Sequence, residues 1–221
     1  MFNFDFDPVR FFGLMFGLII GTTLHEFMHA YSAFRLGDDT AARQGRITLN
    51  PAAHFDPIGF FMGILLALGL FGLAWGRPVP VNPNALRFGR RGMAIVAIAG
   101  PLSNLALAGV LAPLWRFTGG VLPTDIRGVI ENMIYINLLL FAFNLIPIPP
   151  LDGFNILVGI LPNYWSMVLS PIYRYSLPIL LGFVFFVPYL GGIIGIELNP
   201  LREAIGPVYT ILSRLFFGAG V

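Results

Sequence analysis

Residues 11–33 read FFGLMFGLIIGTTLHEFMHAYSA, an apolar run long enough to cross a bilayer as a helix. The whole chain has this character, since 57% of its 221 residues are hydrophobic, 11% are charged and the mean hydropathy is +0.80. A soluble domain carries about 25% charged residues, so a water-soluble globule is excluded. The scattered arginines and the net charge of only +2 argue against a nucleic-acid partner. The absence of cysteine excludes disulfides and thiolate metal ligands.

The run is interrupted by ionisable residues in the order His25-Glu26-Phe27-Met28-His29. Two histidines four positions apart on a helix differ by about 40° in direction and about 6 Å in height, so both can reach one metal ion. Glu26 stands where it can reach a water molecule on that ion, as in the H-E-x-x-H pattern of zinc hydrolases. The alternative is that the two histidines and Glu26 satisfy one another inside a helix bundle.

Stretches without charged residues predict an all-α polytopic membrane protein with about five to six transmembrane or re-entrant helices. They cover residues 11–24, 57–76, 92–115, 132–151, 153–173 and 175–196. We expect one integral-membrane domain over residues 1–221, with its core at 11–160 and further membrane segments at 161–221. Asp5 and Asp7 precede Arg10, which is the wrong charge for a secretory signal peptide, so we expect the first helix to be retained.

The arginines favour a returning path for residues 57–76. If this segment crossed, the arginines at 35–46 and those at 77–91 would lie on opposite sides of the membrane. A segment that dips in and returns puts all seven on one side, as expected for cytoplasmic loops. Its five glycines suit a broken segment, although glycine is also common in ordinary membrane helices. We therefore predict a re-entrant segment, with the N-terminus outside and the Arg-rich loops in the cytosol.

A catalytic zinc ion usually has three protein ligands, and Asp152 is the best further candidate. It follows Asn144-Leu145-Ile146-Pro147-Ile148-Pro149-Pro150-Leu151, in which three prolines remove helical hydrogen bonds. Irregular backbone at membrane depth is tolerated where it is buried in protein or lines a wet cavity, and a lone carboxylate there needs a cation. The alternative is that Asp152 caps the following helix, and the two roles are compatible.

Together these motifs resemble the site-2 protease family of intramembrane zinc metalloproteases, over nearly the whole chain. Gly100-Pro101-Leu102-Ser103-Asn104 matches that family's G-P-x-x-N helix. Residues 45–51 and 77–86 are similar to the membrane-associated β segments of its compact bacterial members. We accordingly expect a small membrane-associated β element, and we expect no PDZ or CBS module.

The resemblance implies roles for particular residues. It implies that His25, His29 and Asp152 bind Zn²⁺ and that Glu26 is the catalytic base. Asn144 would help to hold the substrate or the oxyanion, and Asn104 is a further candidate for substrate binding.

The expected function is that of an intramembrane zinc endopeptidase, which hydrolyses peptide bonds within or near transmembrane segments of a membrane-protein substrate through a zinc-activated water. We expect it in the lipid bilayer of a prokaryotic inner or plasma membrane, with its active site open toward the cytosol. Short strands at 46–49 and 78–81 would pair with an unwound substrate, and simple surface turns are the alternative. The alternative function is a non-proteolytic metal-binding protein or transporter, which would have no use for a base beside the first histidine.

Other residues leave alternatives open. His54 is an interfacial loop histidine, a spare metal ligand or a pH-sensitive plug. Residues 198–221 form an amphipathic helix at the membrane surface or a short final crossing. Small residues between positions 92 and 106 are expected to let helices approach closely. The sequence does not determine the oligomeric state.

Overall fold

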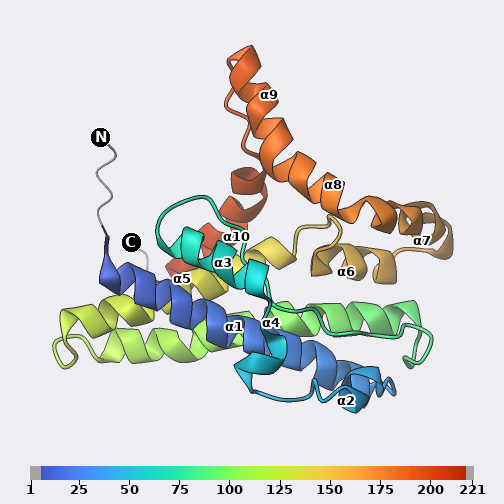
Figure 1. The fold of residues 1–221 in the computed structure, drawn as a ribbon, viewed down its shortest axis with the longest axis horizontal. Helices are drawn as coiled ribbons and strands as arrows, with labels where there is room; N and C mark the ends of the chain where they lie inside the picture. The colour runs from blue at the N-terminus through green and yellow to red at the C-terminus, as the bar shows by residue number, and fades with distance from the viewer. Residues whose placement is uncertain (1–5, 218–221) are drawn as a thin grey trace.

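The computed structural model describes residues 6–217, and its centre is a bundle of three long helices (Figure 1). These are α1 (Pro8–Arg35), α4 (Arg90–Phe117) and α5 (Thr124–Asn144), and each packs against the other two. The short helix α6 (Asp152–Ile160) packs against α4. Apolar side chains such as Leu14, Ile134 and Leu138 fill the space between the helices. The predicted all-α architecture is confirmed.

Glycines on α1 bring this helix unusually close to α5. A Cβ atom added at Gly17 would lie 2.4 Å from Ile136 Cγ2 and 2.9 Å from Met133 Cα. One added at Gly21 would lie 2.3 Å from Asn137 Oδ1. Any side chain at either position would push the helices apart, so this seam fixes the position of α1, and hence of the H-E-x-x-H motif, against α5.

Residues 57–76 form a helix that packs against α1 and then turn back along that helix. Helix α3 (Pro57–Ala67) has 11 residues and is about 16 Å long, well short of the roughly 30 Å of a bilayer core. The chain turns at Gly69, which has a positive φ of 78°. It then runs back along α3, where a Cβ on Gly59 would lie 2.1 Å from the Trp75 carbonyl oxygen. The segment thus folds back on itself in the structure, and its re-entrant path in the membrane stays a prediction.

The chain before residues 57–76 and the chain after them meet beside the end of α1. The buried carboxylate of Asp38 accepts hydrogen bonds from the backbone N–H groups of Thr40 (3.0 Å) and Asn82 (2.6 Å). The Arg87 N–H also donates to the Leu36 carbonyl at 2.8 Å. Burial alone would raise the pKa of Asp38, but hydrogen bonds from the Thr40 hydroxyl and from the Asn82 and Thr40 N–H groups outweigh it and hold the pKa below its ordinary value. The carboxylate therefore stays charged at neutral pH and connects the segment at Thr40 to the segment at Asn82.

The predicted β element is wrong, because no strand is found within residues 6–217. The polar groups that the predicted strand at 78–81 would need are engaged elsewhere. The Arg77 N–H donates to the His54 carbonyl at 2.7 Å, and the Val79 N–H donates to Glu26 Oε2 at 2.8 Å. Pro78 and Pro80 have no N–H to offer. The partner segment at 46–49 is likewise irregular, although the Arg46 guanidinium reaches the Arg77 carbonyl.

A long helical run projects from the bundle (Figure 1). It comprises α7 (Asn163–Leu169), a 3₁₀ turn (Ser170–Tyr175), α8 (Ser176–Leu181), a π turn (Gly182–Phe186) and α9 (Val187–Ile194). Arg174, which separates two of the uncharged stretches, lies within this run. The chain breaks between α6 and α7, at Leu161 and Pro162, because proline cannot donate the next helical hydrogen bond.

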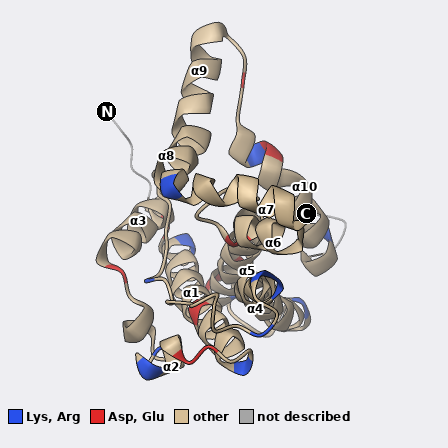
Figure 2. Cartoon of the chain, turned by 90° about the vertical axis from the view of Figure 1, so that its right-hand side faces the viewer, with Lys and Arg blue, Asp and Glu red and all other residues tan. Residues whose placement is uncertain are grey.

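Four helical segments are long and apolar enough to span a membrane: α1, α4, α5 and the run of residues 163–194. In that run 11% of the most apolar stretch is buried, against at least 39% in each of the other three, and Figure 2 shows no charged residue along α8 and α9. Helix α10 (Pro200–Phe217) is not among these segments, and it packs back against α5 and α4. Residues 200–217 thus form one helix, and its place at the membrane surface stays a prediction.

Cysteine labelling tests the returning path. Because the chain has no native cysteine, Thr40→Cys, Asn84→Cys and Thr118→Cys each provide a single thiol. With a membrane-impermeant thiol reagent we expect positions 40 and 84 to be unreactive in intact cells and reactive in inverted vesicles, because Asp38 ties both segments together. Position 118, at the other end of α4, should show the opposite pattern. Labelling of positions 40 and 84 from opposite faces would contradict the fold.

Candidate metal centre

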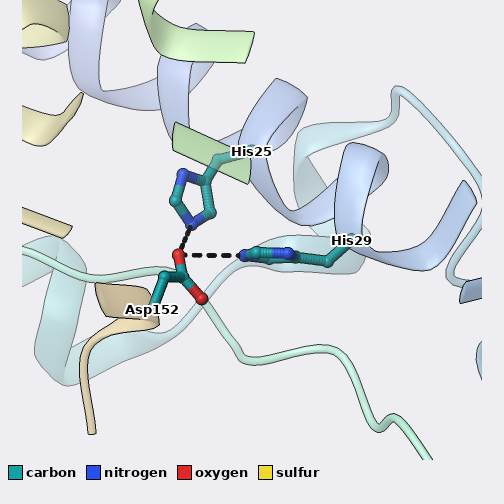
Figure 3. Close-up of side chains that lie close together, drawn as sticks. All are labelled: His25, His29 and Asp152. Atoms are coloured by element: carbon teal, nitrogen blue, oxygen red, sulfur yellow. Dashed lines mark ion pairs between the residues drawn. The ribbon is translucent and has the colours of Figure 1, made fainter. Parts of the chain in front are cut away.

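The side chains of His25, His29 and Asp152 converge on one point (Figure 3). Both histidines project from α1, and Asp152 is the first residue of α6. Asp152 Oδ2 lies 3.1 Å from His25 Nε2 and 3.3 Å from His29 Nε2. The three side chains are only 11–13% exposed, so solvent shields their charges weakly.

The other ring nitrogens determine the histidine tautomers. His25 Nδ1 lies 2.8 Å from Asn104 Oδ1, and His29 Nδ1 lies 2.9 Å from the Val96 carbonyl oxygen. Since an amide or carbonyl oxygen can only accept, Nδ1 carries the proton in both rings, a tautomer assigned from these partners. In the neutral ring each Nε2 then turns a lone pair toward Asp152.

This arrangement fits a bound cation. Asp152 Oδ2 is buried and has no hydrogen-bond donor within the described residues. A proton on one Nε2 would satisfy one contact and leave the other lone pair facing the carboxylate. In a tetrahedral zinc site with bonds of about 2.0–2.1 Å, neighbouring ligand atoms are about 3.3 Å apart, close to the observed 3.1 and 3.3 Å. Two imidazoles and a carboxylate are a common ligand set for catalytic zinc.

Gly100 of α4 leaves room for the three ligand atoms. A Cβ atom at this position would lie 2.4 Å from His29 Nε2 and 2.7 Å from His25 Nε2. The glycine of the G-P-x-x-N motif therefore forms one wall of the site, beyond the packing role expected for small residues in this helix.

The turn before α6 aims Asp152 at the histidines. Leu151 occupies the N-cap position of α6, and no side chain caps this helix. Asp152 therefore contacts the two histidines instead of capping the helix. Gly153 is required beside it, because a Cβ there would lie 2.3 Å from the Leu145 carbonyl oxygen. The carboxylate is also placed at a helix N-terminus, which favours a negative charge.

Glu26 is held by Gly76, the last residue of the returning segment, and by Val79 just after it. Its Oε2 accepts the Val79 N–H at 2.8 Å, its side chain packs beside Gly76, and it is 9% exposed. Its hydrogen-bond partner is thus a backbone amide and neither of the histidines. This argues against the alternative in which the histidines and Glu26 satisfy one another.

The remaining predicted residues have different positions. Asn104 is fully buried behind His25, with its Nδ2 donating to the Gly21 carbonyl (3.1 Å). Asn144, the last residue of α5, is half-buried and donates from Nδ2 to the Leu140 carbonyl (3.0 Å), which leaves it a second N–H. His54 is buried away from the three ligand candidates, with Nε2 2.9 Å from the Thr48 carbonyl oxygen.

Sequence reasoning missed several contacts of this site. The Val96 carbonyl and the Val79 N–H are backbone groups, so no side chain marks them in the sequence. Asn137, which bonds to Asn104, did carry a signal, because a polar residue inside an uncharged membrane stretch needs a partner.

Comparison with known proteins identifies the class. The chain is 38% identical over 209 residues, 91% of its length, to a Bacillus subtilis protein named "Putative zinc metalloprotease YwhC", of which it covers 92%. It is 34% identical over 179 residues (80% of this chain, 67% of the relative) to "Putative zinc metalloprotease Rip2" of Mycobacterium tuberculosis. It is also 34% identical over 160 residues (71% and 74%) to "Putative zinc metalloprotease MJ0611" of Methanocaldococcus jannaschii.

No family model and no solved structure matches the chain. The curated relatives are nevertheless sufficient for an assignment, because YwhC is matched over nearly its full length. The protein belongs to the site-2 protease family of zinc metalloproteases, and zinc is its cofactor. Its four long apolar helical segments agree with a membrane protein.

Metal analysis tests the ligand set. We expect about one zinc per chain in the detergent-purified protein. His25→Ala should lose the metal and Asp152→Ala should bind it far more weakly, because each removes one of the three converging acceptor atoms. His54→Ala, which alters a buried histidine outside the site, should keep its zinc. Full zinc retention in Asp152→Ala would contradict the assignment.

Gly100 offers a second test that leaves every ligand in place. We expect Gly100→Ala to lose most of its zinc, because the added methyl group would overlap both Nε2 atoms. Ala108→Gly, in the same helix but away from the ligands, is the control for altered helix packing and should bind zinc normally. Zinc content can be measured by elemental analysis. Normal binding by Gly100→Ala would show that the side chains do not meet as the structure has them.

Proposed function

We propose that this protein is an intramembrane zinc endopeptidase that hydrolyses peptide bonds within or near transmembrane segments of another membrane protein. The position of the site carries this proposal. His25 lies ten residues before the end of α1 at Arg35, about 15 Å along the helix. Since α1 is a candidate membrane span, this depth lies inside a hydrocarbon core of about 30 Å.

In this proposal His25 and His29 hold the ion through Nε2, and Asp152 holds it through a carboxylate oxygen. When bound, zinc supplies a Lewis acid that polarises the scissile carbonyl and acidifies a water molecule. The Nδ1–H bonds to Asn104 and Val96 keep the two rings turned toward the ion.

Glu26 is proposed as the general base. It takes a proton from the attacking water as that oxygen bonds to the carbonyl carbon, and it gives the proton to the amine nitrogen as the C–N bond breaks. The Val79 N–H holds Oε2, whereas no hydrogen bond to Oε1 is found within residues 6–217. Oε1 is therefore the oxygen available for the proton.

Two asparagines have separate proposed roles. Asn144 would donate its second N–H to the oxyanion that forms on the substrate carbonyl. Asn104 would orient His25 and would not contact the substrate, because it is fully buried and its amide group is already engaged.

An apolar cavity of about 360 Å³ suggests how an apolar substrate is accommodated. It lies between α1 and the returning segment, and Thr22, one turn before Glu26, forms part of its wall. Leu18, Phe60 and Trp75 line it, together with Gly59 and Gly63. We propose that it receives an apolar side chain of the unwound substrate segment.

The arrangement of the arginines supports an active site open toward the cytosol of a prokaryotic cell. The Arg87 N–H bonds to Leu36 at the end of α1, so the Arg-rich loops gather at that end of the bundle. Arg127 stacks over Trp115, with its guanidinium carbon 5.0 Å from the ring centre, at the other end. An excess of arginine at one end is the pattern of a cytoplasmic face.

The base is tested by Glu26→Gln. This variant should keep zinc and fold but lose cleavage, because the amide is nearly isosteric and cannot accept the proton. Cleavage of a reconstituted membrane-protein substrate can be followed by mass spectrometry of the products. Cleavage at the wild-type rate would contradict the mechanism.

The oxyanion role is tested by Asn144→Ala, with Asn132→Ala as the control on the same helix. Asn144→Ala should bind zinc normally and lose about 10²- to 10³-fold in kcat, the usual effect of removing one oxyanion donor. Asn132 bonds to the Gly128 carbonyl of its own helix, so Asn132→Ala should cleave normally. Equal loss in both variants would assign the effect to helix packing.

A further inference from the structure

We propose that Asn137 is a positioning residue of the metal centre, which fixes the tautomer of His25 through Asn104. This inference rests on the proposed role of His25 as a zinc ligand. Asn137 lies in α5, and its hydrogen bonds go to Asn104 and to backbone carbonyls. Its influence therefore has to pass through the buried amide of Asn104.

Backbone carbonyls fix the orientation of the Asn137 amide. Its Nδ2 donates to the Gly17 carbonyl of α1 at 3.2 Å and to the Met133 carbonyl of α5 at 2.9 Å. Because both carbonyls can only accept, the amide nitrogen must face them. Oδ1 then faces α4, where it accepts a hydrogen bond from Asn104 Nδ2 at 3.0 Å.

This contact in turn orients Asn104. Its Nδ2 donates to Asn137 and to the Gly21 carbonyl, so its Oδ1 is left to face His25 Nδ1. An acceptor at this position requires a proton on Nδ1 and leaves the Nε2 lone pair free for a metal. A flipped Asn104 would donate to Nδ1, and the ring proton would then move to Nε2, where it blocks metal binding.

Both asparagines are fully buried, which makes their orientation costly to change. A flipped Asn104 would set its oxygen against the Gly21 carbonyl and Asn137 Oδ1, so that three acceptors would meet without a donor. Such unsatisfied contacts are expensive in a buried, apolar bundle. Three helices thus contribute to one proton position, since Gly17 and Gly21 are on α1, Asn104 is on α4 and Asn137 is on α5.

Asn132 provides a matched control. It lies on the same helix, its Cβ also faces a glycine of α1, Gly13, and its Nδ2 donates to the Gly128 carbonyl four residues earlier. It has no link to Asn104. Asn137→Leu and Asn132→Leu therefore both remove an amide at the seam between α1 and α5, and only the first breaks the connection to His25.

The experiment measures zinc affinity in the detergent-purified full chain by competition with a chelator. Asn137→Leu should bind zinc about 10- to 100-fold more weakly than wild type, the usual effect of losing an outer partner of a ligating histidine. Asn132→Leu should stay within about twofold of wild type. With Co²⁺ in place of Zn²⁺, the visible spectrum of Asn137→Leu should change as His25 leaves the ion, and that of Asn132→Leu should not.

Gly21→Ala perturbs the same connection from another helix and decides the question if Asn137→Leu does not fold. Its added Cβ would lie 2.3 Å from Asn137 Oδ1 and must displace it, so zinc affinity should fall. Gly13→Ala, which meets Asn132 Cβ at 2.5 Å, perturbs the same seam without touching the connection, so its zinc affinity should fall clearly less than that of Gly21→Ala.

Wild-type zinc affinity in a folded Asn137→Leu or Gly21→Ala variant would overturn the inference, as would an equal loss in the two control variants. These outcomes do not depend on proteolysis. If the wild-type protein binds zinc and cleaves no peptide bond, the proposed function fails and the role of Asn137 stands. If Glu26→Gln abolishes cleavage while Asn137→Leu binds zinc normally, only the role of Asn137 fails.

Discussion

The convergence of three candidate metal-ligand atoms on one point is the constraint on which the rest of this structure depends. His25 Nε2, His29 Nε2 and Asp152 Oδ2 meet inside an apolar bundle, where unpaired polar groups are costly. A cation satisfies all three at once. The surrounding helices hold the arrangement, since Gly100 leaves space for the atoms and oxygens of Asn104 and Val96 keep a proton on each Nδ1.

Residues 75–79, where the returning segment ends, hold the carboxylate of Glu26, the proposed base, inside the apolar bundle. Glu26 needs a donor, and the Val79 backbone supplies one between two prolines that have none. Asp38, just after α1, binds the N–H of Asn82 and so fixes the chain that follows these residues to the end of α1. The same polypeptide thus anchors the proposed base and borders the apolar cavity through Trp75 and Gly76, which connects the base structurally to the proposed substrate pocket.

The sequence predicts the parts of the site that depend on local spacing. His25 and His29 lie four residues apart on one helix, and Asp152 is an isolated carboxylate after a proline-rich turn. The return of residues 57–76 was predictable from the arginines on its flanks. Contacts that depend on the register between helices were not predictable, including the Val96 carbonyl, the space at Gly100 and the bond between Asn104 and Asn137. The expected strand at 78–81 fails because Glu26 takes the backbone donor of Val79 and His54 takes that of Arg77 just before it.

X-ray absorption spectroscopy at the zinc edge of the purified protein tests the central claim most directly, because it reports the atoms bound to the metal. The structure predicts a first shell of nitrogen and oxygen at about 2.0–2.1 Å, with the outer-shell scattering of two imidazole rings. Asp152→Ala should alter the oxygen contribution and keep both imidazoles. A shell with one imidazole or three, or a protein that holds no zinc, would contradict the convergence of His25, His29 and Asp152 on a single ion.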